Sequence, residues 1–376
     1  MRQAIESEKI WQEKLVRAAM RENNRKRSYL IVNPSQGKHV PVAPSAALDV
    51  FSSLAAKVQE CTGPTDPVLI IAFAETATAI GAAVAASLTN PTYLMHTTRE
   101  NVEDTDFLFF SEAHSHATEQ RLALRDLDPV LKQVKHIVFV EDEVTTGNTI
   151  WNLMTCLGKQ AILKDITFGI ASLLNGMLPQ HKERFEKQGV FIAYLLHTDN
   201  AALESSIGQY AYDGLLTPVS QAVSIPVKRA EASGMITPRC VVEAKKYQDA
   251  CRNLAGQAAK LIPKEAKRVL ILGTEECMYP GLMAAKALER SHEVRFHATT
   301  RSPILVSGEG NYPLHRRNAL ISCYDKQRAT YIYNLASYDF VLIVTDTSAT
   351  QEGIRTLAAA LEQAGNKAVT VLEWRH

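Results

Sequence analysis

The sequence lacks the spacing that marks metal-binding or disulfide-stabilised proteins. Six cysteines are scattered over its 376 residues, and no two of them form a Cys-x-x-Cys pair. This scatter argues against both a zinc site and a disulfide framework. We therefore expect most of the cysteines to be small core residues.

Strong net charge and long apolar segments are also missing. Forty-one basic and forty acidic residues leave a formal net charge of +1, so no overall field favours nucleic acid or an anionic membrane. No run of about 18 apolar residues is present for a membrane span, and residues 1–27 have the pattern of a charged amphipathic helix, not of a signal peptide. We expect a cytoplasmic protein that binds neither nucleic acid nor membranes.

The sequence does contain a regular alternation of strand-like and helix-like segments. Apolar runs such as residues 68–73 and 136–140 are each followed by a helical pattern. Near-continuous apolar strands between helices are typical of α/β domains whose mainly parallel sheets are covered on both faces, and the length suits two such three-layer domains. The predicted organisation is an N-terminal helix at 1–27, a first domain at 28–212, a proline-containing linker at 213–240 and a second domain at 241–376.

An internal repeat relates the two halves. The run "VLIIAFAET" in the first half matches "VLILGTEEC" in the second, and the Thr-Thr-Arg that ends at Arg99 matches the Thr-Thr-Arg that ends at Arg301. A third match, in the same order, pairs Asp142 with Asp346. Three ordered matches indicate that the second domain is a degenerate copy of the first.

The stretch "HIVFVEDEVTTGNTIWNLM" carries the most specific chemistry. An apolar strand leads through acids into a turn of small residues and then a helix, and ligands of parallel sheets collect at such strand ends. The turn exposes backbone N–H groups that suit a phosphate. Glu141 and Asp142 would repel a phosphate but can accept hydrogen bonds from sugar hydroxyls or hold Mg²⁺ through water. The pattern predicts a ribose 5-phosphate site; the alternative is an N-capped helix after a buried strand.

This stretch resembles the phosphoribosyl diphosphate (PRPP) motif of type I phosphoribosyltransferases. The resemblance implies the fold of that family for the first domain, with Glu141 and Asp142 on the ribose hydroxyls. Two departures are Thr145, where some members carry a catalytic Asp, and Glu143, where the family prefers an apolar residue. The residues implied for the 5-phosphate are Thr145, Thr146, Gly147, Asn148 and Thr149.

Other loops match further parts of the same site. Segment 96–121 occupies the place of the flexible catalytic loop, where Arg99, His114 and His116 are candidates to act on the leaving diphosphate; ordinary surface histidines are the alternative. Glu75 either acts through Mg²⁺ or caps the following helix. The residues implied for the pyrophosphate loop are Ala74, Glu75, Thr76, Ala77 and Thr78.

The segment "GKHVPV" lies where many relatives build a hood over the acceptor base. Lys38 and His39 are candidate donors to that acceptor, and a plain hairpin turn is the alternative. Together with "HTTRE", "SEAHSHAT" and "TTRSP", this segment resembles the phosphoribosyltransferases of bacterial tellurite-resistance and stress-response gene clusters. Those proteins carry a C-terminal domain known by its Thr-Arg-Ser-Pro motif.

The resemblance implies a Mg²⁺-dependent enzyme. It would transfer the ribose 5-phosphate of PRPP to a nitrogen of a nucleobase-like, orotate-like acceptor, or catalyse the reverse, in the biosynthesis of a nucleoside-like metabolite, as a homodimer. A non-catalytic PRPP or nucleotide sensor is the competing hypothesis. For the second domain a different ligand, dimer contacts and a structural role stay open, and its candidate residues are Glu276, Tyr279, Thr300, Arg301 and Ser302.

Overall fold

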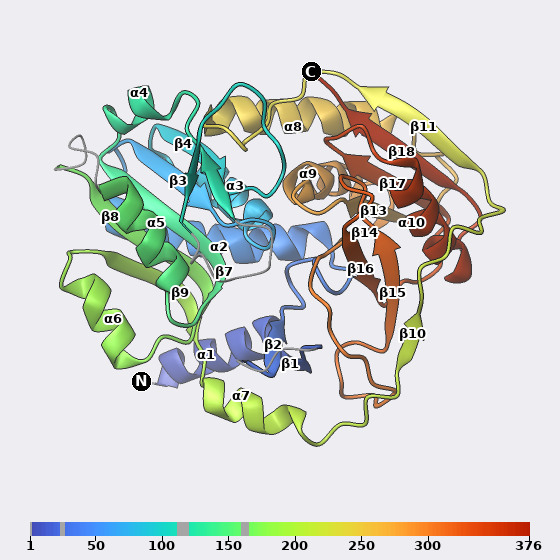
Figure 1. Ribbon diagram of the computed structural model, residues 1–376, viewed down its shortest axis with the longest axis horizontal. Helices are drawn as coiled ribbons and strands as arrows, with labels where there is room; N and C mark the ends of the chain where they lie inside the picture. The colour runs from blue at the N-terminus through green and yellow to red at the C-terminus, as the bar shows by residue number, and fades with distance from the viewer. Residues whose placement is uncertain (1, 23–26, 111–119, 159–164) are drawn as a thin grey trace. The chain divides into compact units, whose positions relative to one another are not determined.

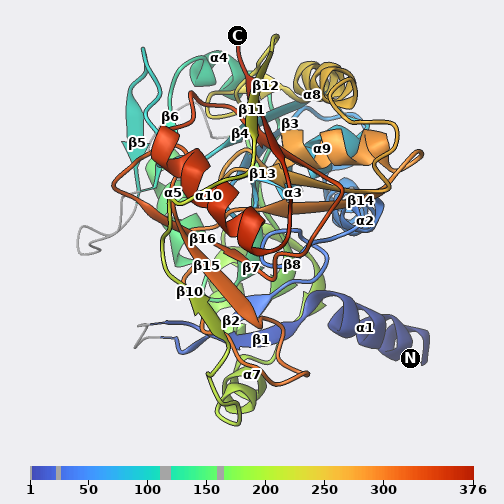
Figure 2. The same ribbon diagram turned by 90° about the vertical axis from the view of Figure 1, so that its right-hand side faces the viewer.

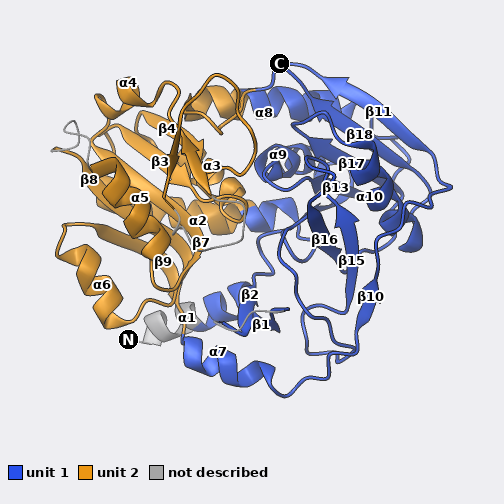
Figure 3. Cartoon of the chain, in the orientation of Figure 1, with its two compact units in different colours: residues 1–47, 199–235, 250–376 blue, residues 48–198, 236–249 orange. Residues whose placement is uncertain are grey.

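Two compact units make up the chain in the computed structural model (Figure 3). Unit 1 comprises residues 1–47, 199–235 and 250–376, and unit 2 comprises residues 48–198 and 236–249. The structure describes residues 2–22, 27–110, 120–158 and 165–376, with side chains from residue 9 onward. Each unit therefore contains segments that are far apart in the sequence.

Unit 2 is built on a six-stranded sheet with helices on its faces (Figure 1). Every strand pair is parallel except β12–β4 at the edge. Strand β3 and residues 137–140 of β7 are apolar because both faces of the sheet are covered there, whereas the carboxyl end of β7 carries acids. The strands in sheet order are β12 (Val242–Glu243), β4 (Thr92–His96), β3 (Val68–Ala72), β7 (His136–Val144), β8 (Thr167–Asn175) and β9 (Phe191–His197). The helices are α3 (Thr78–Ser87), α4 (Leu127–Leu131), α5 (Asn148–Gly158) and α6 (Pro179–Glu186), and a separate hairpin joins β5 (Phe107–Phe109) to β6 (Arg121–Ala123).

Unit 1 contains a five-stranded sheet in which all pairs are parallel. In order its strands are β11 (Val227–Ala232), β18 (Val369–Trp374), β17 (Phe340–Thr345), β13 (Arg268–Gly273) and β14 (Glu293–Ala298). Two smaller sheets are formed by β10 (Leu215–Thr217), β15 (Arg316–Ile321) and β16 (Ala329–Tyr333), and by β1 (Arg17–Met20) and β2 (Tyr29–Val32). The helices are α1 (Arg2–Leu15), α7 (Asn200–Ile207), α9 (Met278–Leu288) and α10 (Gln351–Gln363); Figure 2 shows α10 beside β15.

Two helices contain a boundary between the units. Helix α2 (Pro44–Thr62) begins in unit 1 and continues into unit 2. Helix α8 (Ala244–Ala259) begins in unit 2 and continues into unit 1. The predicted N-terminal helix ends at Leu15, after which β1 pairs with β2. Among the described residues, no helix is both long and apolar enough to cross a membrane.

The internal repeat is present in the fold as a shared strand order. Strands β4-β3-β7-β8 of unit 2 correspond to β14-β13-β17-β18 of unit 1. The register agrees too, since Val68 lies opposite Thr92 and His136, and its counterpart Val269 lies opposite Val294 and Phe340. These four strands therefore have the same order and the same connections in the two sheets.

Loop hydrogen bonds show where the two copies diverge. Ala74 N donates to Thr97 Oγ1 at 2.9 Å, and Glu275 N donates to Thr299 Oγ1 at 3.0 Å, so Ala74 and Glu275 are equivalent. The next helix begins at Thr78 in unit 2 and at Met278 in unit 1. The loop is thus one residue shorter in the second copy.

Candidate functional site

The acids of the first copy lie within strand β7, which continues through them to Val144. Glu141 lies opposite Ser172 of β8, and Asp142 Oδ1 accepts a hydrogen bond from the N–H of Glu143 at 2.9 Å. Side chains alternate along a strand, and Glu141 and Glu143 both line a pocket that Asp142 does not line. Glu141 therefore lines the pocket, whereas its neighbour Asp142 does not.

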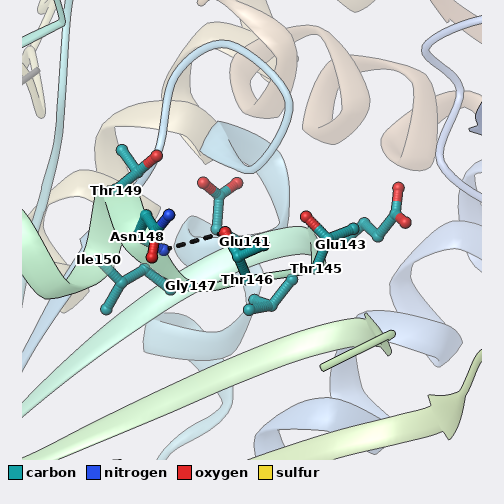
Figure 4. Close-up of a pocket in the computed structure, with 9 residues that line it drawn as sticks. Glu141, Glu143, Thr145, Thr146, Gly147, Asn148, Thr149 and Ile150 are labelled. Carbon is teal, nitrogen blue, oxygen red and sulfur yellow. Dashed lines mark hydrogen bonds between the residues drawn. The ribbon is translucent and has the colours of Figure 1, made fainter. Parts of the chain in front are cut away.

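An open pocket of about 290 Å³ lies at the carboxyl end of β7 (Figure 4). It brings together Glu141, the small-residue turn and the first residues of α5, whose opening N–H groups favour an anion. In Figure 4 the carboxylate of Glu141 stands beside the turn, whereas that of Glu143 points away from it. The lining residues are Glu141, Glu143, Val144, Thr145, Thr146, Gly147, Asn148, Thr149 and Ile150.

Glycine is required in this turn for two separate reasons. Gly147 has φ +70°, a left-handed conformation that residues with a Cβ adopt at a cost. A Cβ at this position would also lie 2.7 Å from Cε2 of Phe185. The carbonyl of Gly147 accepts the N–H of Trp151 at 2.8 Å and so begins the hydrogen-bond ladder of α5.

Arg184 of α6 holds the turn in shape. Its Nη2 donates to the carbonyl of Thr146 at 2.8 Å and its Nη1 donates to Oδ1 of Asn148 at 2.9 Å. The guanidinium lies over the rings of Trp151 and Phe185. Burial lowers the pKa of Arg184 below its usual range, yet a guanidinium stays charged at neutral pH. Nothing in the sequence around position 184 predicts this role, because no pattern there connects it to a turn 36 residues earlier.

The loop after β3 is tied to the loop after β4. Thr97 binds the N–H of Ala74, while Gln120 donates to the Ala74 carbonyl at 3.0 Å. Thr78 Oγ1 donates to the carbonyl of Glu75 at 3.0 Å, and the side chain of Glu75 is buried. The Ala74–Glu75 peptide is cis. The candidate pyrophosphate loop is therefore an ordered turn at the carboxyl end of its strand.

The hairpin that follows β4 is anchored at its base. Thr98 and Arg121 form an antiparallel bridge, and the guanidinium of Arg121 donates to the carbonyl of Glu100 at 2.8 Å. Arg99 lies in this base and is half-buried. The other two candidates, His114 and His116, lie outside the described residues.

Lys38 and His39 lie in unit 1, whereas the acidic strand end and its turn lie in unit 2. Both side chains are buried, and the ring of His39 meets the ring of Tyr333 edge to face. Burial lowers the pKa of His39 well below its usual value, and the charges of Lys38 and His297 lower it further. The structure thus does not bring these residues into the unit that holds the proposed phosphate turn.

The equivalent site of the second copy is filled by its own side chains. Glu275, 1% exposed, accepts hydrogen bonds from Arg301 Nε at 2.7 Å and Arg328 Nη1 at 3.0 Å, and also from Ser322. Tyr324 donates to Asp346, the counterpart of Asp142. Ser322, Tyr324 and Arg328 all belong to the turn between β15 and β16.

The remaining candidates of the second copy lie around this cluster. Glu276 pairs with Arg301 at 3.7 Å, and Tyr279 is buried in the first turn of α9. Thr300 bridges to Tyr331 through its backbone and accepts the N–H of Ser302 at 3.2 Å. The sequence pointed to Glu276, Arg301 and Asp346 of this cluster. It gave no signal for Glu275, Tyr324 or Arg328.

Two family models cover most of the chain. One, described as "Phosphoribosyl transferase", matches residues 15–194, and the other, described as "TRSP domain C terminus to PRTase_2", matches residues 238–361. The chain belongs to the family in which a phosphoribosyltransferase domain precedes a TRSP domain. This confirms the resemblance found in the sequence, and the acidic strand end with its turn lies in the phosphoribosyltransferase domain.

Solved structures give more distant similarities. Adenine phosphoribosyltransferase from Rhodothermus marinus is 12% identical over 52% of this chain and 99% of its own, with a TM-score of 0.35. The adenine phosphoribosyltransferase from Trypanosoma brucei, in complex with AMP, pyrophosphate and ribose-5-phosphate, is 13% identical over 51% of this chain and 78% of its own, with a TM-score of 0.36. A hypothetical protein from Neisseria gonorrhoeae with bound ppGpp is 19% identical over 43% and 84%, with a TM-score of 0.28. No curated protein matches the sequence.

Proposed function

We propose that this phosphoribosyltransferase domain transfers the ribose 5-phosphate of PRPP to a ring nitrogen of a nucleobase-like acceptor, or catalyses the reverse reaction. The observation that carries the proposal is the pocket at the end of β7, where Glu141 stands beside the turn of residues 145–149 at the start of α5. An acid for sugar hydroxyls next to an anion-binding turn fits a ribose 5-phosphate.

The 5-phosphate would be bound by the turn itself. Backbone N–H groups around Gly147 and the hydroxyls of Thr145, Thr146 and Thr149 are its donors, with the opening N–H groups of α5 behind them. Arg184 fixes the turn through Thr146 and Asn148 and contributes positive charge close to the phosphate.

The ribose hydroxyls would be bound by Glu141 and Asp142. Carboxylates accept hydrogen bonds from vicinal hydroxyls and orient the sugar, so that its C1 atom faces the acceptor. Glu143 adds a third carboxylate at the pocket rim. Three acids in a row also give this strand end a negative field that suits a cation.

Magnesium fits this donor set as an ion shared with the substrate. Among the described residues, no three His, Cys, Asp or Glu side chains group as a metal site, and Mg²⁺ is commonly held by one or two carboxylates, waters and substrate phosphates. Glu141 and Asp142 would hold it through water, with Glu75 as a further candidate at the loop after β3. The ion would neutralise charge on the leaving diphosphate.

The reaction breaks the bond between C1 and the diphosphate oxygen and forms a bond from C1 to the acceptor nitrogen. Residues 74–78, Arg99, His114 and His116 are the candidates to bind and protonate the departing diphosphate. Thr145 is not a base, so the proton released by the acceptor nitrogen would pass to the departing diphosphate. Orientation and exclusion of water would therefore supply most of the catalysis.

The wider role that we propose follows from the family. The domain would act in the cytoplasm, as a homodimer, in the biosynthesis of a nucleoside-like metabolite linked to tellurite resistance and stress response. The domain limits predicted from the sequence, at 28–212 and 241–376, belong to the same proposal.

The direct test is ligand-induced stabilisation by PRPP and Mg²⁺. At a hundred times its Kd, a ligand adds about 2.7 kcal/mol to the free energy of unfolding. We expect a rise in melting temperature that disappears in Asp142→Asn and persists in Asp346→Asn, the equivalent change in the second copy. Release of diphosphate with an acceptor panel then separates an enzyme from a PRPP sensor, which would bind without turnover. No shift in the wild type would refute the proposal.

A further inference from the structure

Both backbone polar groups of Ala74 are held by side chains. Its N–H donates to Oγ1 of Thr97 at 2.9 Å, and its carbonyl accepts a hydrogen bond from Nε2 of Gln120 at 3.0 Å. Oγ1 of Thr97 in turn donates to Oε1 of Gln120 at 3.3 Å. The three residues therefore form a closed cycle of hydrogen bonds, in which each donates once and accepts once.

The cycle joins three segments of unit 2 at the carboxyl ends of β3 and β4. Ala74 lies two residues after the end of β3, Thr97 directly follows β4, and Gln120 directly precedes β6. Ligands of parallel sheets bind at this end of the strands. Ala74 is also the first residue of the candidate pyrophosphate loop, so the cycle fixes the backbone from which that loop starts.

The backbone around the cycle is held by bonds that do not involve Gln120. Thr98 and Arg121 exchange two backbone hydrogen bonds of 2.9 and 3.1 Å, and the N–H of Thr97 donates to the carbonyl of Ala72 at 2.9 Å. Ala74 itself is only 6% exposed, and a buried carbonyl that loses its donor is costly. Loss of the Gln120 carboxamide should thus disturb the start of the loop and leave the hairpin in place.

The second copy keeps the threonine of this cycle but carries an acid in place of Ala74. Glu275, the equivalent of Ala74, donates its N–H to Oγ1 of Thr299 at 3.0 Å, and its carboxylate accepts hydrogen bonds from Arg301 and Arg328. The second copy therefore supplies its own anion at this loop. Ala74 carries only a methyl group, so an anion at the same loop of the first copy has to come from a ligand.

We propose that Gln120 is a positioning residue for diphosphate binding, which holds the carbonyl of Ala74 so that the loop of residues 74–78 is preformed for the diphosphate of PRPP. The proposal rests on the function proposed above. A diphosphate is attracted by N–H groups and repelled by carbonyl oxygens, so the orientation of the first peptide groups decides whether such a loop binds it. Gln120 keeps the Ala74 oxygen on a donor of the protein.

Calorimetric titration of the full chain with ribose 5-phosphate and with PRPP, each with Mg²⁺, tests this role. Both probes carry the 5-phosphate, but only PRPP carries the diphosphate, so we expect the wild type to bind PRPP more tightly. Gln120→Leu should lower PRPP affinity about 10-fold, as for a buried carbonyl that loses its hydrogen bond, and leave ribose 5-phosphate affinity unchanged.

Gln133→Leu is the matched control. The carboxamide of Gln133 also donates to a backbone carbonyl, that of Pro129 at 2.9 Å, and accepts from a hydroxyl, that of Tyr93 at 3.1 Å. These bonds are exposed and lie outside the candidate loops, so Gln133→Leu should change neither affinity.

Gln120→Glu separates positioning from a general structural defect. At pH 8 its carboxylate can accept from Thr97 but cannot donate to the carbonyl of Ala74, so PRPP affinity should fall as in Gln120→Leu. At pH 5 the carbonyl favours the protonated carboxyl, which donates again. The loss relative to the wild type at the same pH should therefore shrink.

Equal PRPP affinities in the wild type and Gln120→Leu, or equal losses for both probes in that variant, would overturn the proposal. If Gln120→Leu does not fold, Gln120→Glu decides by the same comparison, and a loss that does not depend on pH would count against the role. A wild type that binds PRPP no more tightly than ribose 5-phosphate would also overturn it. A wild type that binds neither probe would instead refute the proposed function itself.

Discussion

At the scale of single residues, the proposed phosphate turn depends on contacts that come from elsewhere in unit 2. Phe185 excludes any side chain at position 147, and Arg184 bonds to both Thr146 and Asn148. The turn sequence was recognisable from its own small residues. Arg184 and Phe185 of α6, which support the turn, were not recognisable, because side-chain contacts between distant elements leave no periodic pattern in the sequence.

The substitution Gly147→Ala tests whether the turn needs glycine for its backbone and for its space. A Cβ in the left-handed region costs about 1–2 kcal/mol, and the clash with Phe185 should add about 1–3 kcal/mol. We expect ribose 5-phosphate binding to be lost and the urea midpoint to fall. Gly189→Ala is the matched control, because φ is +69° there and no atom lies within 4 Å of the added Cβ. Equal destabilisation by both changes would contradict the predicted clash.

Arg184→Leu should loosen the turn and also remove the positive charge that Arg184 places close to the proposed phosphate. Loss of the two hydrogen bonds to Thr146 and Asn148 is expected to weaken ribose 5-phosphate about 10-fold in a calorimetric titration. Arg184→Lys keeps the charge but cannot bond to both acceptors, so the affinity of this variant for ribose 5-phosphate should lie between those of the wild type and Arg184→Leu. Lys187→Leu, an exposed residue at the end of the same helix, should have no effect. Equal affinities for wild type and Arg184→Leu would show that the turn needs no support.

At the scale of elements, the second copy carries a hairpin that packs onto the strand ends of its own sheet. The turn between β15 and β16 packs onto its own strand ends, with Arg328 on Glu275 and Tyr324 on Asp346. The second copy therefore fills with protein the positions at which the first copy is proposed to bind PRPP. Its core still repeats the first, since α9 packs on β13, β14 and β17 as α3 packs on β3, β4 and β7.

The Arg328–Glu275 pair should stabilise unit 1 strongly. Arg328→Gln removes one charged partner from a carboxylate that is 1% exposed but keeps Arg301, so we expect a cost of about 1–3 kcal/mol, as for one lost hydrogen bond to a buried charge. The double change Glu275→Gln with Arg328→Gln should recover part of that loss, as measured by urea unfolding. An additive double mutant would contradict direct coupling of the two side chains.

Two buried histidines, His39 in the segment that pairs with β14 through Val42 and His297 in β14 itself, predict a pH dependence of stability. Burial is the main cause that lowers the pKa of both His39 and His297 below the usual 6.5. Below about pH 6.5 the unfolded chain then binds more protons than the folded chain, so the free energy of unfolding falls as the pH is lowered. Stability measured at pH 8 and pH 5.5 should differ less in His39→Gln than in the wild type. His197→Gln, an exposed histidine, should retain the full dependence, and a wild type equally stable at both values would refute the prediction.

At the scale of the whole molecule, the chain forms two units that are not two consecutive segments. Residues 236–249 belong to unit 2 although unit 1 contains the residues on both sides of them. Unfolding of unit 2 would release residues 236–249, which are continuous at both ends with unit 1. Unfolding of unit 1 would release residues 1–47, which lead directly into unit 2. The linker predicted at 213–240 therefore includes part of unit 2.

We expect a single cooperative unfolding transition as a result. In differential scanning calorimetry the calorimetric and van't Hoff enthalpies should agree for the full chain, as for one cooperative unit. Two separate transitions, or a calorimetric enthalpy about twice the van't Hoff value, would show that the two units unfold independently although their segments alternate along the chain.

The sequence by itself determined the class of fold, the internal repeat and the small-residue turn at the end of β7. Each of these depends on local properties: apolar runs of strand length, small residues at a strand end, and matches in fixed order. Only the tertiary structure showed that Val42 pairs with β14 of the second copy and that Val242 pairs with β4 of the first. Only the tertiary structure showed that Arg184 supports the turn. Strand pairing at a sheet edge is made by backbone groups that every residue carries, so the sequence of an edge segment does not specify its partner.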